Sequence, residues 1–262
     1  IRKYRKAKIV SDFIKNNTNI SGIIFDHWKS LELINKDLLK NKKVLCLIHS
    51  KEINHPINSR LNNRIIKSLK KTNLIIANSL FTKNLAINSG IEKDKIIIIN
   101  PGIYEPIKID DLNQKKAEAI YKDSFPKLIT VARFDKRKGQ DMVIMAIKNL
   151  KDKFPKIKYV CIGYGQEEKQ LLRLSKSLGL EKQIVFLKNI NNKFKFALIK
   201  NANLYVMPTK IVGKSVEGFG ISYIEAGSYG IGSVGGLGDG SADAIVDKKT
   251  GLLCEGNNFN SV

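Results

Sequence analysis

The chain contains 262 residues, of which 43% are hydrophobic and 27% are charged. This balance is typical of a globular protein and excludes a disordered one, and the length suffices for two domains of ordinary size. No apolar run approaches the roughly 20 residues that a membrane-spanning helix needs. Cys46, Cys161 and Cys254 each stand in an apolar, strand-like run. Their spacing is unlike a zinc site or a disulfide framework, which indicates buried, reduced thiols in a cytosolic protein.

The formal net charge of +22 raises the question of an acidic partner. The basic residues are spread along the whole chain and no recognised nucleic-acid motif occurs, so we expect no nucleic-acid partner. An anionic membrane face is a further candidate, because polybasic surfaces attract acidic lipids. The best candidate for a membrane-binding patch on this chain is the stretch with Arg2, Lys3, Arg5, Lys6 and Lys8. A merely solvated basic surface is the alternative.

Strand-like and helix-like runs alternate along almost the whole sequence. In the first part, strands are predicted at Gly22–Phe25, Lys43–Ile48, Leu74–Ala77 and Lys95–Ile99, and helices at Lys29–Lys40, Ile57–Lys71 and Leu80–Ser89. In the second part, strands are predicted at Leu128–Val131, Lys158–Ile162, Ile184–Leu187, Leu204–Met207, Gly232–Val234 and Gly251–Cys254. Helices are predicted there at Gln140–Lys153, Glu167–Leu178, Lys193–Asn201 and Ile221–Tyr229. Short apolar strands separated by helices favour parallel sheets covered on both faces.

The predicted fold class is therefore α/β, with two Rossmann-like, doubly wound parallel-sheet domains. The charged stretch between Tyr104 and Pro126 interrupts the alternation, so the domain boundary is expected there. We predict a partial N-terminal domain over residues 1–115 and a C-terminal domain over residues 116–262. Because the chain begins with Ile1 rather than Met, we interpret it as a fragment. Ligands of such sheets bind beyond the carboxyl ends of the strands, and a cleft between two domains is the expected site.

The most informative segment runs from Glu217 to Glu225, with the sequence Glu-Gly-Phe-Gly-Ile-Ser-Tyr-Ile-Glu. It follows a predicted strand that ends before Pro208, which places Glu217 on a loop and Glu225 inside a helix. The glycines would lie at the helix N-terminus, where free N–H groups bind anions and glycine permits close approach. The segment therefore predicts a site for a phosphate-bearing, hydroxyl-rich ligand.

A basic loop follows the predicted strand Leu128–Val131 and carries Arg133, Arg137 and Lys138. Cations that leave the carboxyl end of a strand point toward the ligand side of the sheet. Arginine can hold a diphosphate with two parallel hydrogen bonds, and lysine adds a compact charge. A solvated basic loop is the alternative in a chain this rich in lysine.

Glycines also follow two later strands. Gly163-Tyr164-Gly165 follows the strand ending at Ile162, and a second cluster runs from Gly235 to Gly240. The second cluster could present N–H groups to a phosphate or form a flexible turn. In the first domain, His49 follows the strand that ends at Ile48. Its ring could donate to a sugar hydroxyl or a phosphate, or be hydrogen-bonded within its own loop.

These motifs together resemble the retaining glycosyltransferases of family 4, the group 1 glycosyltransferases. The nonapeptide matches the acidic E-x7-E signature, and Ala132 to Gly139 matches the family's loop from (G/A)R to KG. The resemblance is strongest from Leu128 to Cys254 and extends to the region from Gly22 to Gly102. It implies the GT-B architecture. Two parts of the family pattern are expected to be absent, the first strand before Ile1 and the last helices after Val262.

The resemblance also implies roles for individual residues. Catalytic roles fall on His49 and Glu217, the latter orienting the donor sugar. Donor binding would use Arg133 and Lys138 for the diphosphate and Glu225 for the ribose. The remaining implied donor-binding residues are Gly163, Gly218, Phe219, Gly220 and Ile221. No metal site and no cofactor are expected, because no D-x-D motif occurs and cations would replace the metal.

The expected function is transfer of a sugar from a nucleotide-diphosphate-sugar donor to an acceptor hydroxyl, in cell-envelope polysaccharide or glycolipid synthesis. The expected acceptor is a sugar or a lipid-linked sugar. The expected location is cytoplasmic, with peripheral contact to the inner face of the membrane. Two alternatives are a nucleotide-sugar 2-epimerase of the same architecture and a non-catalytic basic module that binds membrane or nucleic acid. A glycosidase pair is disfavoured, because eight helical steps would separate Glu217 and Glu225 by roughly 12 Å, beyond the separation that flanks one glycosidic bond.

Overall fold

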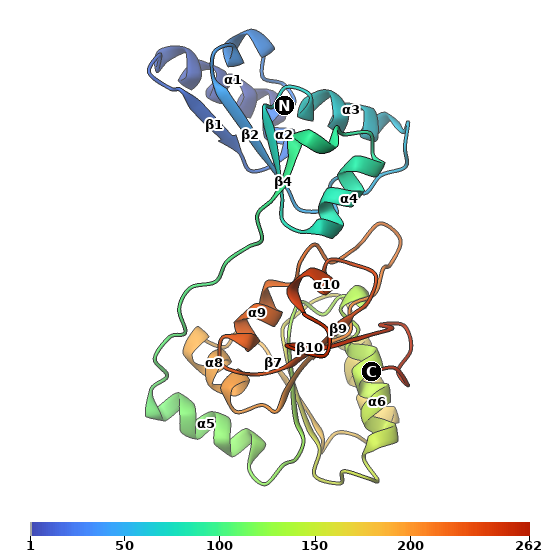
Figure 1. Ribbon diagram of the computed structural model, residues 1–262. Helices are drawn as coiled ribbons and strands as arrows, with labels where there is room; N and C mark the ends of the chain where they lie inside the picture. The colour runs from blue at the N-terminus through green and yellow to red at the C-terminus, as the bar shows by residue number, and fades with distance from the viewer. Residues whose placement is uncertain (1) are drawn as a thin grey trace. The chain divides into compact units, whose positions relative to one another are not determined.

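Ten strands form two separate parallel sheets in the computed structural model, which describes residues 2–262 (Figure 1). By its internal contacts the chain divides into two compact units, Ile1–Pro101 and Gly102–Val262. Each unit has its own sheet and its own apolar core. The prediction of two Rossmann-like α/β domains is confirmed.

The first unit contains a four-stranded sheet in the order β1-β2-β3-β4. Its strands are β1 (Gly22–Phe25), β2 (Lys43–Ile48), β3 (Leu74–Ala77) and β4 (Ile96–Ile98). Its helices are α1 (Arg2–Asn16), α2 (Trp28–Leu31), α3 (Arg60–Leu69) and α4 (Leu80–Asn88), with the 3-10 turns η1 (Lys36–Leu39) and η2 (Lys93–Lys95). All pairs are parallel, and Cys46 of β2 stands between Phe25 and Ile75 of its neighbours. One continuous core joins the strands to the helices.

The second unit contains a six-stranded sheet in the order β10-β9-β8-β5-β6-β7. Its strands are β5 (Lys127–Val131), β6 (Lys158–Ile162), β7 (Ile184–Leu187), β8 (Leu204–Met207), β9 (Ser233–Gly236) and β10 (Gly251–Cys254). Its helices are α5 (Asp111–Tyr121), α6 (Gln140–Leu150), α7 (Glu168–Ser177), α8 (Asn192–Lys200), α9 (Ile221–Gly227) and α10 (Ser241–Ala244), with the 3-10 turn η3 (Lys136–Lys138). The strand order reverses between β5 and β8, and open parallel sheets bind ligands at such a switch point. The loops after these two strands therefore leave the sheet side by side.

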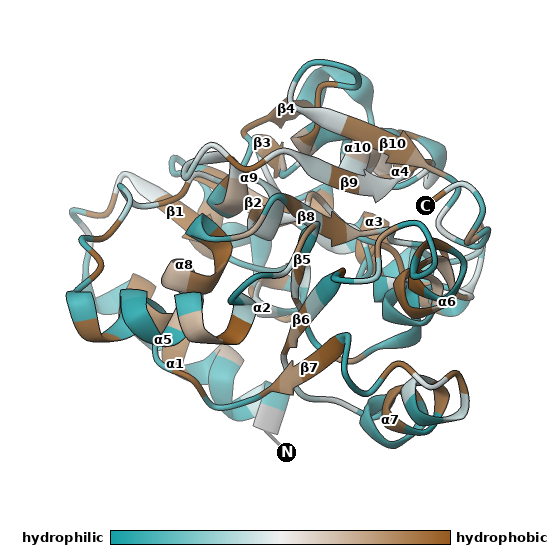
Figure 2. Cartoon of the chain, turned by 90° about the horizontal axis from the view of Figure 1, so that it is seen from below, coloured by the Kyte–Doolittle hydropathy of each residue, from teal (hydrophilic) through white to brown (hydrophobic). Residues whose placement is uncertain are grey.

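Alternate residues of the central strands pack on opposite faces of this sheet. One core contains Ile129, Val160 and Tyr205, together with residues of α5, α8 and α9. The other contains Leu128, Tyr159 and Val206, together with residues of α6 and α7. Because both faces are covered, the strands are mostly apolar, as the brown colour of β7 in Figure 2 illustrates.

The structure differs from the sequence prediction at several helical segments, including the short α10, which was not predicted. The predicted helix Lys29–Lys40 is wrong as one element, because Asn35 takes an extended conformation and caps a new turn at Asp37. Helix α1 was expected only as a basic stretch. Helix α5 lies where the alternation was expected to stop, since its charged sequence hides a narrow apolar stripe of Ala117 and Tyr121 that packs into the core. The contact division after Pro101 precedes the boundary predicted after residue 115, which falls inside α5.

The cysteines are buried and free of disulfides, as expected. Burial raises the pKa of the Cys46 and Cys161 thiols to about 12, which keeps them protonated and unreactive. Within residues 2–262, no helix combines the length and the apolar character needed to cross a bilayer. The same residues contain no group of three or more His, Cys, Asp or Glu placed to hold a metal ion. The expectation of a reaction without metal stays a prediction.

We predict that Ser79→Ala lowers the free energy of unfolding of the first unit by about 1 to 2 kcal/mol. Ser79 is fully buried, and its hydroxyl oxygen accepts from the Thr82 N–H at 3.0 Å at the start of α4. Alanine would leave that N–H without a partner. Urea unfolding measures the loss, with the exposed Ser177→Ala as the control, which should change stability by less than about 0.5 kcal/mol. Equal effects of the two variants would contradict the capping role.

Candidate active site at the switch point of the second sheet

The loop after β5 is held against the loop after β8 by close backbone packing. The Asp135 side chain accepts from the Arg137 N–H at 3.2 Å and begins η3. Gly139 ends this turn with φ of 72°, and a Cβ there would overlap the carbonyl oxygen of Pro208. Only glycine combines that backbone angle with that contact. The packing brings the basic residues of the first loop to the acidic loop that follows β8.

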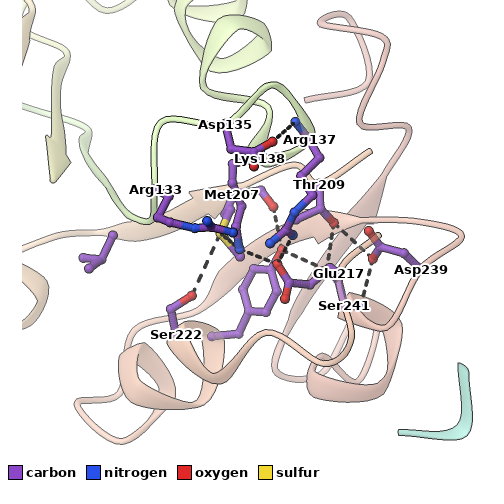
Figure 3. Close-up of polar contacts among 12 residues, drawn as sticks. Arg133, Asp135, Arg137, Lys138, Met207, Thr209, Glu217, Ser222, Asp239 and Ser241 are labelled. Carbon is purple, nitrogen blue, oxygen red and sulfur yellow. Dashed lines mark hydrogen bonds and ion pairs between the residues drawn. The ribbon is translucent and has the colours of Figure 1, made fainter. Parts of the chain in front are cut away.

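Glu217 is the centre of a buried ion cluster (Figure 3). Its Oε2 atom lies 2.7 Å from Nη1 of Arg137 and is also ion-paired with Nζ of Lys138. The side chains of Arg137, Lys138 and Glu217 are only 10%, 10% and 13% exposed. One carboxylate oxygen thus holds two cations from the neighbouring loop, away from bulk water. Lys138 and Glu217, both predicted as site residues, are in direct contact.

The protonation of this cluster follows from burial and charge together. Desolvation opposes ionisation of Glu217, but the charges of Lys138 and Arg137 outweigh it and hold the pKa of the carboxyl below its usual value. Desolvation also lowers the pKa of Lys138, and the nearby Arg137 adds to this. Glu217 remains ionised at neutral pH because it has two cationic partners.

The glycines after β9 serve close packing around this loop. A Cβ on Gly236 would overlap the Thr209 carbonyl, and one on Gly240 would overlap the Gly218 carbonyl. The Gly240 N–H donates to the backbone oxygen of Glu217 at 3.0 Å. The sequence left open whether these glycines form a phosphate loop or a flexible turn. In the structure they allow close backbone packing between the segments that follow β8 and β9.

A buried acid lies behind the Glu217 loop. Asp239 Oδ1 accepts from the Thr209 hydroxyl at 3.1 Å and from the Ser241 N–H at 2.9 Å. Desolvation raises the pKa of Asp239, in spite of these hydrogen bonds. The residue joins the segments that follow β8 and β9 (Figure 3).

Arg133 and Gly163 line one surface cavity of about 340 Å³. Arg133 comes from the loop after β5, and Gly163 follows β6. A Cβ on Gly163 would overlap the Ala132 carbonyl, so this glycine fixes the approach of the two loops. Ile190 and Lys195 line the same cavity. The cavity thus places two cationic side chains, Arg133 and Lys195, beside one ligand-sized space.

Glu225 lies inside α9, as predicted, and faces a second cavity of about 380 Å³. Its Oε1 atom is 3.1 Å from Nζ of Lys195 on α8. Ile221 lines the same cavity, whose further wall is the segment 102–107. Between the two acids, Gly220 has φ of 90° and caps α9, while Phe219 is buried and only 5% exposed. These positions agree with the predicted layout, and their roles in binding stay predictions.

His49 belongs to the first unit, at the carboxyl end of β2. Its backbone N–H donates to Oε1 of Glu52 at 2.5 Å, and its Nε2 atom lies 3.3 Å from the Asp26 carbonyl oxygen. The ring thus has a partner within its own unit. A role for His49 beside the donor stays a prediction.

Two residues that contact the predicted acids were not selected from the sequence. Arg137 was noted in its loop, but it stands at an unspecified position of the family motif that identified Arg133 and Lys138. The sequence feature that could have identified Arg137 is its position next to Lys138, in a short turn that Asp135 caps. Lys195 was missed because a lysine four residues into a helix is ordinary in this chain, and only the structure pairs it with Glu225.

We predict that Arg137→Met lowers the free energy of unfolding of the second unit by about 2 to 3 kcal/mol at neutral pH. The cost is smaller than for a buried charge that loses its only partner, because Lys138 still pairs with Glu217. The depressed pKa of Glu217 contributes stability above the usual carboxyl value of 4.5, which is lost as the pH falls through the folded-state value. The variant raises that pKa, so its cost should shrink below pH 4.5.

Denaturant unfolding across pH measures this difference. The matched control is Lys188→Met, which removes an exposed ion pair to Glu168 with an N–O distance of 2.7 Å and should cost less than about 1 kcal/mol. An Arg137→Met cost no larger than the control, or one independent of pH, would refute the electrostatic role.

Comparison with known proteins places these motifs in a family. The family model described as "Glycosyl transferases group 1" matches residues 111–262, more than half of the chain. A relative from Mycolicibacterium smegmatis, "GDP-mannose-dependent alpha-(1-6)-phosphatidylinositol monomannoside mannosyltransferase", is 32% identical over 139 residues, which are 52% of this chain and 36% of that protein. An "Uncharacterized 41.2 kDa protein in cps region" of Klebsiella pneumoniae is 27% identical over 201 residues, 74% of this chain and 51% of that protein. The chain thus spans about a third to a half of the length of these relatives.

Solved structures match the fold over nearly the whole chain. Anabaena HepE, crystallised with UDP, has a TM-score of 0.82 at 17% identity, covering 97% of this chain and 70% of that one. A glycosyltransferase from Rickettsia africae has a TM-score of 0.77 at 18% identity, covering 98% and 68%. At this identity the likeness is evidence of fold alone, and the fold is GT-B. With the family match over the second unit, the chain belongs to the group 1 glycosyl transferases.

Proposed function

We propose that this chain forms the donor-binding part of a retaining glycosyltransferase. The enzyme would transfer a sugar from a nucleotide-diphosphate sugar to an acceptor hydroxyl. The observation that carries the proposal is the ion pair of Lys138 and Glu217, which lies next to the loop of Arg133 where the strand order of the second sheet reverses (Figure 3). A cation-rich switch point with a fixed carboxylate suits a ligand that joins a diphosphate to a polyol.

The diphosphate would bind beside Arg133 and Lys138. Bond cleavage leaves additional negative charge on the departing diphosphate, and cations fixed in advance stabilise that charge as it develops. The Lys138 ammonium is held by Glu217, which keeps it at one position. The proposal assigns no metal and no cofactor to the reaction, because these cations perform the charge stabilisation.

The two acids would hold different parts of the donor. Glu217 lies with the cations and would accept from a hydroxyl of the donor sugar. Glu225 lies further along, inside α9, and would accept from the ribose diol. Their separate environments, one a buried cluster and the other a cavity wall, fit two contacts along one extended ligand better than a hydrolytic pair. A catalytic role for His49 belongs to the same proposal.

The printed names of similar proteins support a donor and acceptor class. One relative is a GDP-mannose-dependent mannosyltransferase that acts on a phosphatidylinositol monomannoside, and another is encoded in a cps region. A solved neighbour holds UDP. We therefore propose a nucleoside-diphosphate sugar as donor and a sugar or lipid-linked sugar as acceptor, in cell-envelope polysaccharide or glycolipid synthesis.

We predict that the chain binds UDP or GDP saturably and that Arg133→Ala weakens this binding about tenfold to a hundredfold. Loss of a charge-assisted hydrogen bond to phosphate costs roughly 1.5 to 3 kcal/mol, which sets this range. Titration calorimetry measures the change, and the exposed Arg173→Ala on α7 is the control for a lost positive charge. No saturable binding of any nucleoside diphosphate, together with salt-sensitive binding to vesicles or DNA, would instead favour a non-catalytic basic module.

A peripheral membrane contact would bring a cytoplasmic enzyme to a lipid-linked acceptor on the inner face. We propose helix α1 as the contact element. Its side chains Lys3, Arg5 and Lys8 are exposed, and its only acidic residue is Asp12. Ile9 and Phe13, one helical turn apart, are each 60% exposed on the same helix. Exposed apolar side chains among basic ones are typical of helices that lie in a membrane interface.

We expect the triple charge reversal K3E/R5E/K8E to reduce binding to phosphatidylglycerol vesicles at least tenfold, because each basic residue near an anionic surface contributes about 1 kcal/mol. Vesicle co-sedimentation at moderate salt measures the change. The matched control reverses Lys169, Arg173 and Lys176, which are exposed on α7. If both triple variants lose binding equally, the contact is a diffuse charge effect and α1 is not its site.

A further inference from the structure

Lys195 lies where the two cavities of the second unit meet. It lines the cavity that contains Arg133 and also the cavity that contains Glu225. Its ammonium pairs with Oε1 of Glu225 at 3.1 Å, and the two side chains are 17% and 23% exposed. The pair joins α8 to α9 and is sheltered more than the surface ion pairs of this chain, such as Lys40–Asp37, whose side chains are 73% and 68% exposed.

The ammonium of Lys195 lies against an aromatic ring. Its ammonium lies 4.0 Å from the centroid of the Phe196 ring, and Phe196 stacks on Tyr229 with centroids 5.3 Å apart. The Tyr229 hydroxyl in turn accepts from the Ile107 N–H at 3.1 Å. A cation held against an aromatic face has few alternative positions. Glu225 therefore meets a cation that stays in one place.

We propose that Lys195 is a positioning residue for the ribose of the nucleotide, acting through Glu225. It holds one oxygen of that carboxylate, while Oε2 makes no hydrogen bond within residues 2–262 and remains free to accept from a ribose hydroxyl. The inference rests on the proposed nucleotide site and adds to it a residue that determines the preference for ribose over deoxyribose.

The physical reason is orientation. A carboxylate that can rotate accepts from the ribose diol in many geometries, and part of the binding free energy is lost in ordering it. A carboxylate held at one oxygen presents the other in a fixed direction, so that removal of the 2′-hydroxyl costs more. The charge of Lys195 also attracts any diphosphate. That attraction acts equally on ribonucleotides and 2′-deoxyribonucleotides, so it cancels in the ratio of their dissociation constants.

The test is this ratio, measured by calorimetry for UDP against 2′-deoxy-UDP and for GDP against 2′-deoxy-GDP. We expect Lys195→Met to reduce the preference for the ribonucleotide about fivefold, the lower end of typical coupling between sites. The matched control is Lys193→Met on the same helix, which removes a pair to Asp110 at 3.3 Å whose side chains are 57% and 41% exposed. Lys193→Met should leave the ratio unchanged.

A double-variant cycle separates positioning from simple loss of charge. In Glu225→Gln the preference should already be reduced, and adding Lys195→Met should not reduce it further, because both act on one contact. If Lys195→Met weakens both nucleotides equally and leaves the ratio intact, or if the two effects add, the inference is overturned. If the unmodified chain binds none of the four nucleotides, the proposed function itself fails.

Discussion

One carboxylate oxygen with two cations is the interaction on which the candidate site depends. Glu217 is nearly enclosed by protein, and an ionised carboxyl in that position is tolerable only with partners. Arg137 and Lys138 supply them from the loop after β5, and in exchange their own charges are compensated. Neither loop can take a different course without leaving a buried charge unpaired. The cluster therefore fixes the relative position of the loops at the switch point.

Steric fit makes that electrostatic contact possible. Gly139, Gly236 and Gly240 each stand where a Cβ would overlap a backbone atom of another loop. Their absence of a side chain lets the segments after β5, β8 and β9 approach to backbone contact. Asp239 then joins Thr209 and Ser241 behind the acid. The glycines thus allow the backbones of these segments to come close, and the ion cluster and the hydrogen bonds then hold the segments together.

The sequence predicts most strands because each is a short apolar run, and the charged residues Lys43, Lys127 and Lys158 stand only at the first position of their strands. It predicts α5 poorly because only two of its three buried residues, Ala117 and Tyr121, are apolar, and the rest of the helix is rich in charged and polar residues. At the site, the family pattern located Arg133, Lys138, Glu217 and Glu225 on the expected loops and helix. It could not locate their partners, because the pairing of Glu217 with Arg137 and of Glu225 with Lys195 brings together segments that are far apart in sequence.

The net charge of the site matches the charge of the proposed donor. Arg133, Arg137 and Lys138 carry three positive charges and Glu217 carries one negative charge, a balance of +2. The diphosphate of a nucleotide sugar carries roughly two negative charges, so its binding would bring the site close to neutrality. When the sugar leaves, negative charge on the diphosphate increases beyond that balance. The Lys138 ammonium has three donors, so it could hold Glu217 and contact the diphosphate at the same time. Because Glu217 already keeps this cation in place, it would stabilise the added charge without first having to be reoriented. The ion cluster around Glu217 would thus keep its cations in position through the whole reaction.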